Sequence, residues 1–241
     1  CPLVHEAGHW NFTLADRSKL PDSAIGWLIN NPHNPTGALF DRAILSPLLD
    51  ESALVVVDEA FMDFLPPDRQ QSAIDWVLQF PNLVVVRSLT KFYSLPGLRL
   101  GYAIAHPDRL KRWQQWRDPW SVNALAAAVG EVVVQDQEFQ RQTWNWLATA
   151  KAQLTNDLTA IPGLTVYPGA ANFLLVESDR AVTDLQTALL QRHQILIRDC
   201  LSFPELGDRY FRVAVRLPEE NARLVAAIAQ ELAWLTTPSR S

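Results

Sequence analysis

The stretch Leu54-Val55-Val56-Val57-Asp58-Glu59 decides the fold expected for this chain. Its β-branched run has no polar alternation, which is typical of a strand that is buried on both faces. Similar apolar runs occur at residues 24–29, 83–86 and 101–105. Between the runs at residues 24–29 and 54–57, Asp41 can cap a helix that carries apolar residues on one side. This alternation predicts an α/β fold with a sheet covered by helices.

The second half of the chain has a different pattern. Residues 107–160 hold several helical patterns with almost no strand signal. Further on, strands are predicted at residues 164–167, 172–177, 195–198 and 210–216, and helices near 180–193 and 218–235. We therefore predict three parts, namely an α/β large domain over residues 1–110, connecting helices over 111–150 and a small C-terminal α+β domain over 151–241.

The composition narrows the function classes. The chain has 241 residues, of which 48% are hydrophobic and 20% charged, and its formal net charge is −5. A sizeable core can therefore form, while the mildly acidic balance argues against nucleic-acid and anionic-membrane partners. No apolar run approaches the roughly 18 residues that cross a bilayer. With only two cysteines and no signal-peptide pattern at the start, a cytoplasmic location is expected.

Polar residues follow the first three predicted strands. The loop Asn30–Gly37 follows the first, Asp58 ends the second, and Ser88-Leu89-Thr90-Lys91 follows the third. Ligands of open α/β sheets bind outside the carboxyl ends of the strands. Taken singly, these residues could equally serve as turns, a cap and a solvated lysine. Their occurrence after three successive strands favours a binding site.

The residue types in this group suit one cofactor. A lysine can form a Schiff base with an aldehyde, and an aspartate can pair with a pyridinium nitrogen. Hydroxyl and guanidinium groups can hold a phosphate, and Ser88, Thr90 and Arg99 lie near Lys91 in the sequence. These residues are therefore candidates for binding a phosphorylated pyridine aldehyde.

Five motifs, in the same order along the chain, carry a family resemblance. They are Asn31–Gly37, Asp58–Phe61, Ser88–Lys91, Gly97–Tyr102 and Tyr210–Val215. The chain thereby resembles fold-type I pyridoxal-phosphate enzymes of the class I/II aminotransferase superfamily. The resemblance implies a cofactor-binding large domain, incomplete at its N-terminus, followed by a small domain.

The resemblance also implies residue roles. Lys91 would carry the Schiff base, Asp58 would pair with the pyridine nitrogen, and Asn34 would bond the 3′-oxygen. Ser88 and Arg99 would bind the cofactor phosphate, and Arg212 the substrate α-carboxylate.

Within the superfamily, two enzyme families are close. Residues 87–97, 119–126, 195–200 and 212–216 look more like threonine-phosphate decarboxylases than like histidinol-phosphate aminotransferases. The resemblance implies a lyase that decarboxylates L-threonine O-3-phosphate to (R)-1-amino-2-propanol O-2-phosphate in cobalamin biosynthesis. Transamination of histidinol phosphate is the alternative.

Both substrates are small phosphorylated compounds, so an arginine cluster is expected. Arg198 and Arg216 are candidates for the substrate phosphate, with a surface or interdomain ion pair as the alternative role for each. Asn172 could line the pocket, or serve packing or a turn.

The chain departs from the family pattern in two ways. Phe61 stands where the family often has Tyr, which leaves Asn34 alone at the 3′-oxygen. Only about thirty residues precede Asn31, whereas family members carry a long N-terminal portion there. A homodimer is expected for the full-length enzyme. An inactive truncated fragment, or a non-enzymatic interaction protein, is the further alternative.

The start of the chain holds one rival motif. His5-Glu6-Ala7-Gly8-His9 matches the zinc-protease pattern H-E-x-x-H, which requires both histidines on one helical face. However, Gly8 weakens a helix, and Trp10, Phe12 and Leu14 then alternate as in a strand. We therefore expect no metal site.

Overall fold

The computed structural model describes residues 3–6, 9–12 and 26–236. The chain forms two units. Unit 1 holds most of residues 10–144, and unit 2 holds residues 145–241 together with the short segment Pro35–Gly37. Each unit has its own sheet and its own core, and each is described by itself below.

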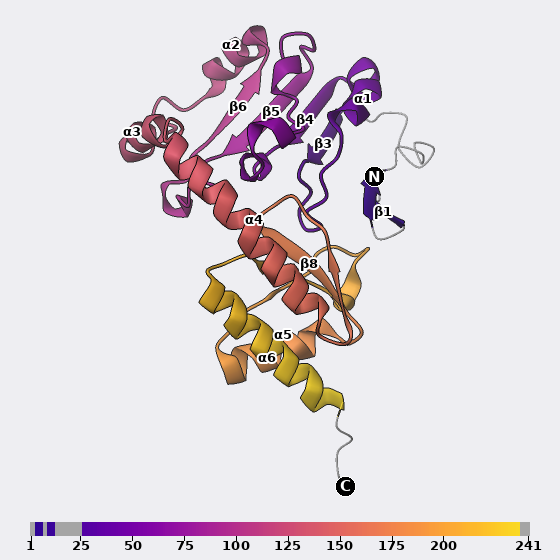
Figure 1. Ribbon diagram of the computed structural model, residues 1–241. Helices are drawn as coiled ribbons and strands as arrows, with labels where there is room; N and C mark the ends of the chain where they lie inside the picture. The colour runs from indigo at the N-terminus through magenta and orange to yellow at the C-terminus, as the bar shows by residue number, and fades with distance from the viewer. Residues whose placement is uncertain (1–2, 7–8, 13–25, 237–241) are drawn as a thin grey trace. The chain divides into compact units, whose positions relative to one another are not determined.

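Unit 1 is built on a four-stranded sheet (Figure 1). Its strands are β3 (Gly26–Asn30), β4 (Leu54–Asp58), β5 (Leu83–Ser88) and β6 (Gly101–Ala105), in that spatial order. The first three run parallel, and β6 pairs antiparallel with β5. The structure confirms a strand at each of the four predicted positions.

Helices lie between these strands and after them. Those between the strands are η2 (Arg42–Leu45), α1 (Ser46–Glu51), η3 (Met62–Phe64), η4 (Pro67–Arg69), η5 (Ile74–Trp76) and η6 (Pro96–Leu98). After β6 come α2 (Pro107–Trp116), α3 (Ala124–Val133) and the long α4 (Gln137–Thr159), which continues into unit 2. The predicted cap at Asp41 is confirmed, because its Oδ1 accepts from the Ala43 N–H at 2.8 Å. The first turn that it caps is a 3-10 helix, not an α-helix.

The N-terminal strands bear on the zinc motif. Residues Leu3–Glu6 form β1 and residues His9–Phe12 form β2, which pair in a two-stranded sheet. His5 and His9 therefore lie on strands, while Ala7 and Gly8 lie outside the described residues. The helical face that the zinc-protease pattern requires is not formed.

One face of the unit 1 sheet carries the core. Its inward side chains and those of η2, α1 and the 73–80 segment form one buried apolar cluster, made of Ile29, Leu45, Leu48, Leu49, Val55, Val57, Ala73, Val77, Leu83 and Val85. Each fully buried aliphatic side chain of this kind contributes about 1.5–3 kcal/mol. This packing fixes where the strands end, and hence where the polar residues that follow them lie.

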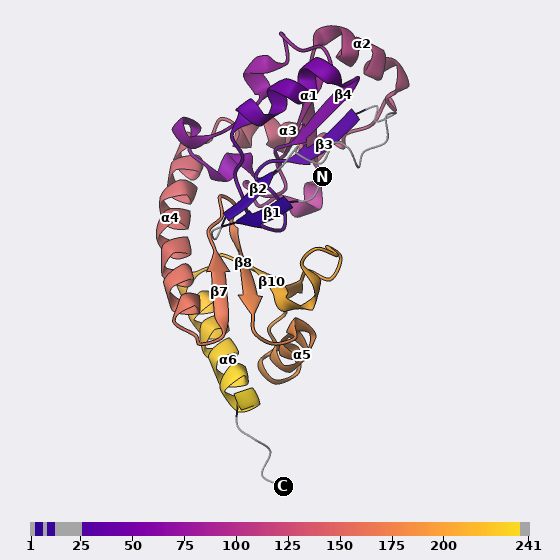
Figure 2. The same ribbon diagram turned by 90° about the vertical axis from the view of Figure 1, so that its right-hand side faces the viewer.

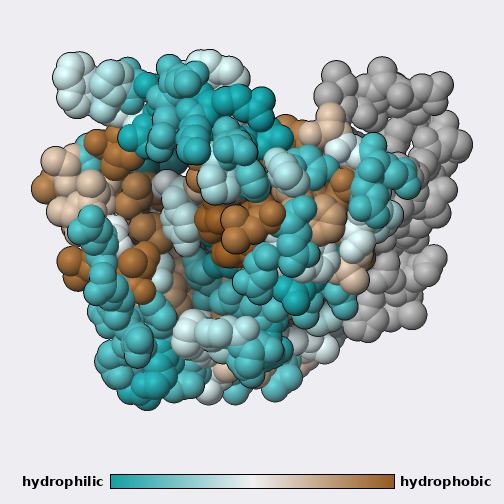
Figure 3. All heavy atoms as spheres, turned by 90° about the horizontal axis from the view of Figure 1, so that it is seen from above, coloured by the Kyte–Doolittle hydropathy of each residue, from teal (hydrophilic) through white to brown (hydrophobic). Residues whose placement is uncertain are grey.

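The opposite face of the sheet is less covered. Leu28, on β3, is 78% exposed, and Ala103, on β6, is also exposed. Trp116 and Trp120, at and beyond the end of α2, are exposed as well. A space-filling view shows apolar patches among polar ones on the surface (Figure 3). Exposed apolar area of this kind is typical of surfaces that contact other protein.

Unit 2 has a four-stranded antiparallel sheet (Figure 2). The strands are β7 (Leu164–Tyr167), β8 (Phe173–Ser178), β9 (Arg198–Asp199) and β10 (Tyr210–Ala214), in the spatial order β7-β8-β10-β9. Its helices, besides the end of α4, are α5 (Val182–His193), η7 (Gly207–Arg209) and α6 (Pro218–Thr236). The predicted α+β character of this half of the chain is confirmed.

Helical spacing explains the core of unit 2. The buried residues of α4 are Leu147, Ala150, Leu154 and Leu158, which recur every three or four positions and so share one face. The central strand β8 is buried at all four positions 173–176, so both of its faces are covered. None of the helices in the described part of the chain is long and apolar enough to cross a bilayer.

One predicted strand is wrong in most of its length. Residues 195–198 were expected to form a strand, but only Arg198 and Asp199 pair, with β10. Gln194 ends α5 in the left-handed conformation (φ 56°), and the Ile195 N–H bonds the Leu189 carbonyl. The backbone before Arg198 therefore closes the helix and cannot join the sheet.

Candidate active site

The carboxyl ends of β3, β4 and β5 meet at one edge of the unit 1 sheet. Asn30 and Asp58 are register partners, and Ser88 ends the next strand. Because β6 runs antiparallel, its first residue, Gly101, pairs with Ser88 at this same edge. A Cβ at Gly101 would lie 2.8 Å from the Arg87 carbonyl oxygen, so the close approach of β6 requires glycine.

Asp58 presents a carboxylate at this edge. Its side chain is half-buried, and Oδ1 accepts from the Ala60 N–H at 2.9 Å. It makes no ion pair with any residue in the described part of the chain. A half-buried carboxylate held by a backbone amide can pair with a protonated ring nitrogen.

The turn after β5 presents two hydroxyl groups. Ser88 Oγ and Thr90 Oγ1 lie 2.8 Å apart, and Ser88 Oγ also accepts from the Thr90 N–H at 3.3 Å. The Leu89 N–H bonds the Leu100 carbonyl, which ties this turn to the residues that begin β6. Both hydroxyls are half-buried, in keeping with a site for phosphate oxygens.

Lys91 follows on the same turn and is exposed. Its Nζ lies 5.9 Å from the centroid of the Phe61 ring. The next residue, Phe92, is 2% exposed and makes edge contacts with the rings of Phe64 and Phe139. The buried Phe92 ring fixes the backbone beside the exposed Lys91. The sequence analysis did not identify this role of Phe92.

Arg99 lies at the end of η6 and is exposed. Its backbone is left-handed (φ 54°), a conformation that non-glycine residues adopt seldom. Its Nη1 donates to the Pro96 carbonyl at 3.0 Å, which leaves further guanidinium donors for an anion.

The loop after β3 is held by a buried asparagine. Asn31 Nδ2 donates to the Phe40 carbonyl at 3.0 Å, and Asn31 Oδ1 accepts from the Phe40 N–H at 2.9 Å. Asn34, within this loop, is half-buried, and its carbonyl accepts from Asn30 Nδ2. The loop is thereby closed across its base, and Asn34 lies within the closed segment.

In unit 2, two arginines face each other across a strand pair. Arg212, on β10, and Arg198, on β9, are direct register partners. The Arg212 guanidinium carbon lies 4.6 Å from the centroid of the Phe173 ring. Burial, together with the charge of Arg198, lowers the pKa of Arg212. Like charges directly opposite destabilise a sheet, whereas an anion between them would be held by both.

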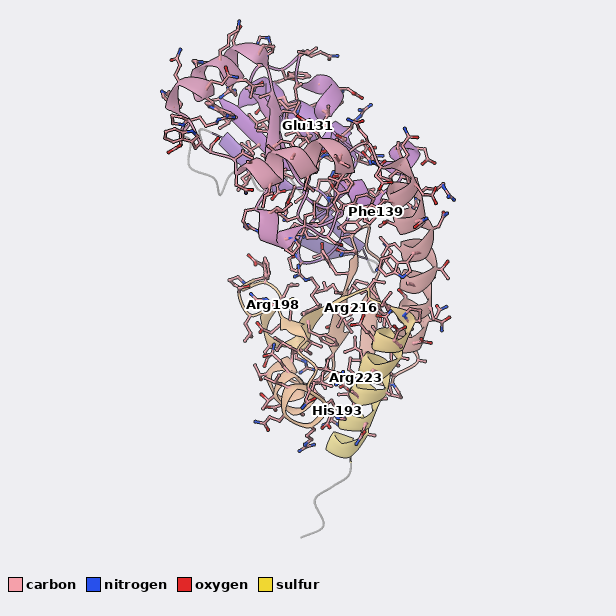
Figure 4. The ribbon with its side chains drawn as sticks, turned by 90° about the vertical axis from the view of Figure 1, so that its left-hand side faces the viewer. Glu131, Phe139, His193, Arg198, Arg216 and Arg223 are labelled. Carbon is pink, nitrogen blue, oxygen red and sulfur yellow. The ribbon has the colours of Figure 1, made fainter. Side chains whose placement is uncertain are left out.

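Arg216 and Asn172, the other candidates in unit 2, have partners of their own. Arg216 Nη2 lies 2.6 Å from Glu220 Oε1 in an exposed pair, so the ion pair foreseen as the alternative role of Arg216 does form. Arg198 forms no salt bridge with any described residue. Figure 4 labels both arginines. The carbonyl of Asn172 accepts from the Val215 N–H at 2.9 Å, which joins the start of β8 to the segment after β10.

Sequence reasoning missed the charges behind the sheet edge. Glu59 and Arg87 are buried and directly paired, although each adjoins a residue that was singled out, Asp58 and Ser88 respectively. The signal was a charged residue at the end of each apolar run. The pairing itself, 28 positions apart in the sequence, requires the strand register.

Residues 8–228 match the family model of aminotransferase class I and II. The chain belongs to this family. The expected fold-type I architecture is confirmed, and the family consists of pyridoxal-phosphate-dependent enzymes.

Relatives within the aminotransferase class I and II family differ in reaction. The chain is 42% identical over 234 residues to threonine-phosphate decarboxylase of Salmonella typhimurium, covering 95% of this chain and 64% of that protein. It is 35% identical to histidinol-phosphate aminotransferase 2 of Ralstonia nicotianae, covering 88% of this chain and 57% of that protein. The chain thus spans about three fifths of the length of these relatives.

A solved structure of the family shows the same fold. The L-threonine-O-3-phosphate decarboxylase from Porphyromonas gingivalis superposes with a TM-score of 0.78 at 26% identity. The match covers 90% of this chain and 68% of that one.

Proposed function

We propose that this chain belongs to a pyridoxal-phosphate-dependent carboxy-lyase. Its substrate is L-threonine O-3-phosphate and its product (R)-1-amino-2-propanol O-2-phosphate. The observation that carries the proposal is the gathering of a carboxylate, two hydroxyls and a lysine at one sheet edge, on the strand ends of Asp58 and Ser88. Decarboxylation is favoured over transamination by the greater identity to the decarboxylase, 42% against 35%.

The donor set fits the cofactor. Lys91 would hold its aldehyde carbon, Asp58 the proton on its ring nitrogen and Asn34 its ring oxygen. Ser88, Thr90 and Arg99 would hold its phosphate. When bound, the cofactor supplies an electron sink for the pair released from a broken bond at the substrate Cα.

The unit 2 arginines would hold the substrate. A guanidinium fork binds a carboxylate or a phosphate through two parallel hydrogen bonds. Arg212, half-buried and stacked on Phe173, would take the α-carboxylate, and Arg198, opposite it, the phosphate. We no longer assign the phosphate to Arg216, because Glu220 already pairs with it.

Covalent labelling tests the cofactor site. Pyridoxal 5′-phosphate added to the chain and reduced with borohydride should label Lys91, as read by peptide mass. Lys91→Ala should abolish the label and the visible absorbance. Lys111→Ala is the matched control, since Lys111 is also exposed, at 76%, and should leave both unchanged. A label that persists in Lys91→Ala would remove this lysine from the role.

Product analysis separates the two reactions. With O-phospho-L-threonine, the expected result is release of carbon dioxide and formation of the amino alcohol phosphate. Histidinol phosphate with 2-oxoglutarate should yield no glutamate. Formation of glutamate without release of carbon dioxide would establish the aminotransferase alternative, which the similarity to the Ralstonia nicotianae protein supports.

A further inference from the structure

A cluster of buried charge lies at the ends of β4 and β5. Glu59 is fully buried, and Arg87 is 5% exposed. Arg87 Nε donates to Glu59 Oε2 at 2.8 Å, and its Nη1 donates to the Asp63 carboxylate. The Ser72 hydroxyl donates to Glu59 Oε2 at 2.8 Å and accepts from Arg87 Nη2 at 3.1 Å. The guanidinium is therefore bonded on all three of its nitrogens.

The cluster adjoins the predicted cofactor residues in sequence but lies on the other face of the sheet. Glu59 follows Asp58, and Arg87 precedes Ser88. Because successive side chains of a strand point to opposite faces, Asp58 and Ser88 share one face while Glu59 and Arg87 share the other. The Glu59 N–H also bonds the Val86 carbonyl at 2.8 Å, so side chains and backbone both tie the end of β4 to β5.

The third member extends the cluster to the loop beneath Lys91. Asp63 lies in η3, two residues after Phe61, whose ring faces Lys91 Nζ. The Asp63 carbonyl accepts from Trp144 Nε1 at 2.8 Å, which anchors the same turn from α4. Through Asp63, Arg87 is thus connected to the segment that carries Phe61, the ring near Lys91.

Packing alone would not require charge at these positions. The same sheet face is apolar at Val55, Val57, Leu83 and Val85, and becomes ionic only where Glu59 and Arg87 stand. Burial raises the pKa values of Glu59 and Asp63, and the charge of Arg87 opposes both shifts. A buried ion pair is in general no more stabilising than an apolar pair of the same volume. The guanidinium of an arginine in such a pair adds a defined geometry, because its N–H donors are fixed in one plane.

We propose that Arg87 is a positioning residue, which holds Asp58, Ser88 and Phe61 in place for the cofactor through Glu59 and Asp63. The inference rests on the proposed function. It assigns to three charged side chains that do not touch the cofactor the task of setting the groups that do.

Two single variants and their combination test this role. Glu59→Gln and Arg87→Met each remove one partner and leave the other buried, so each should lower the unfolding free energy. The double variant removes the fully buried ion pair and leaves Asp63, which is 17% exposed, without its partner, so it should recover part of that stability. Outer partners of metal ligands are worth about 10–100-fold in affinity, and we expect about 10-fold weaker binding of pyridoxal 5′-phosphate in all three variants.

Two measurements separate the effect of each variant on cofactor binding from its effect on stability. Absorbance titration gives the Kd for pyridoxal 5′-phosphate and the absorption maximum of the bound cofactor, while urea unfolding of the cofactor-free chain gives stability. Glu231→Gln is the matched control, because Glu231 is a 3% exposed carboxylate in unit 2, paired with Arg192 and His193 at 2.7 Å. It should lose stability and keep its Kd within twofold and its absorption maximum unchanged.

The expected result is a double variant that regains part of its stability but keeps the weakened Kd and a shifted absorption maximum. Recovery of Kd and absorption maximum together with stability would overturn the proposal, as would a Kd that follows stability alone in every variant, the control included. Failure of the proposed function would look different, since the wild-type chain itself would then show no reducible label on Lys91.

Discussion

The two units treat arginine in opposite ways. In unit 1, Arg87 is buried against Glu59 and Asp63, and its donors are used within the fold. In unit 2, Arg198 and Arg212 face each other across a strand pair, and their charges repel. An arginine matched by carboxylates serves the architecture, whereas two arginines in register across a strand pair repel each other and would both be stabilised by an anion bound between them.

A second cluster of matched charges shows that the contrast depends on the partners of an arginine and not on the unit in which it lies. Unit 2 also contains a matched cluster, in which Glu231, on α6, accepts from Arg192 and contacts His193, at the end of α5. Arg223 donates to the His193 carbonyl, and Figure 4 labels both residues. This cluster joins α5 to α6, as Arg87 joins β4 to β5.

The largest expected effect concerns the matched arginine. Arg87→Met leaves Glu59 buried without its ion-pair partner, and breaking a buried pair costs about 3–5 kcal/mol. Urea unfolding at neutral pH measures this loss. A loss below about 1 kcal/mol would mean that the cluster is hydrated in solution, and the contrast between the units would fail.

The opposed arginines should behave in the reverse manner. Arg212→Met keeps the packing on Phe173 and removes one of two repelling charges, so its loss of stability should stay well below the one expected of Arg87→Met. Loss of a charge-assisted contact to the substrate should lower kcat/KM for O-phospho-L-threonine about 100-fold. Steady-state kinetics and urea unfolding check both arms. A loss of stability as large as that of Arg87→Met would show that Arg212 is structural.

His33 shows a third solution, in which a buried titratable group stays neutral. Burial lowers the pKa of His33 from 6.5 to about 4. The unfolded chain therefore binds more protons between these values, and stability falls as the pH drops from about 6.5 to 4, by about 3 kcal/mol. Urea unfolding across this range should show a smaller loss for His33→Gln than for wild type. Parallel profiles would place the imidazole in water.

The smallest effect is expected at Arg216. Its pair with Glu220 is exposed and screened, so Arg216→Met should leave the urea midpoint unchanged. The KM for O-phospho-L-threonine should change less than twofold, whereas Arg198→Met should raise it about 10-fold. A tenfold rise in Arg216→Met would assign the substrate phosphate to Arg216 and leave Arg198 as a surface residue.

Local pattern was enough for most of the fold. The apolar run before Asp58 and the run before Ser88 predicted strands where strands form, but the prediction that both sheet faces are covered is wrong for unit 1, where Leu28 is 78% exposed. Local pattern also failed at Ile195, where apolar residues that resemble a strand instead finish a helix. Helix termination depends on the left-handed turn at Gln194, a residue type that gives no strong signal for it.

Local sequence predicts the alternation of strands and helices, the polar residues at the strand ends and the candidate lysine, because these depend on neighbours within a few positions. Three further features emerge on folding: Glu59 pairs with Arg87, Arg198 lies opposite Arg212, and Phe92 anchors the turn of Lys91. Those contacts join residues 14 to 47 positions apart. Their partners follow from strand register and chain reversal, which no local pattern encodes.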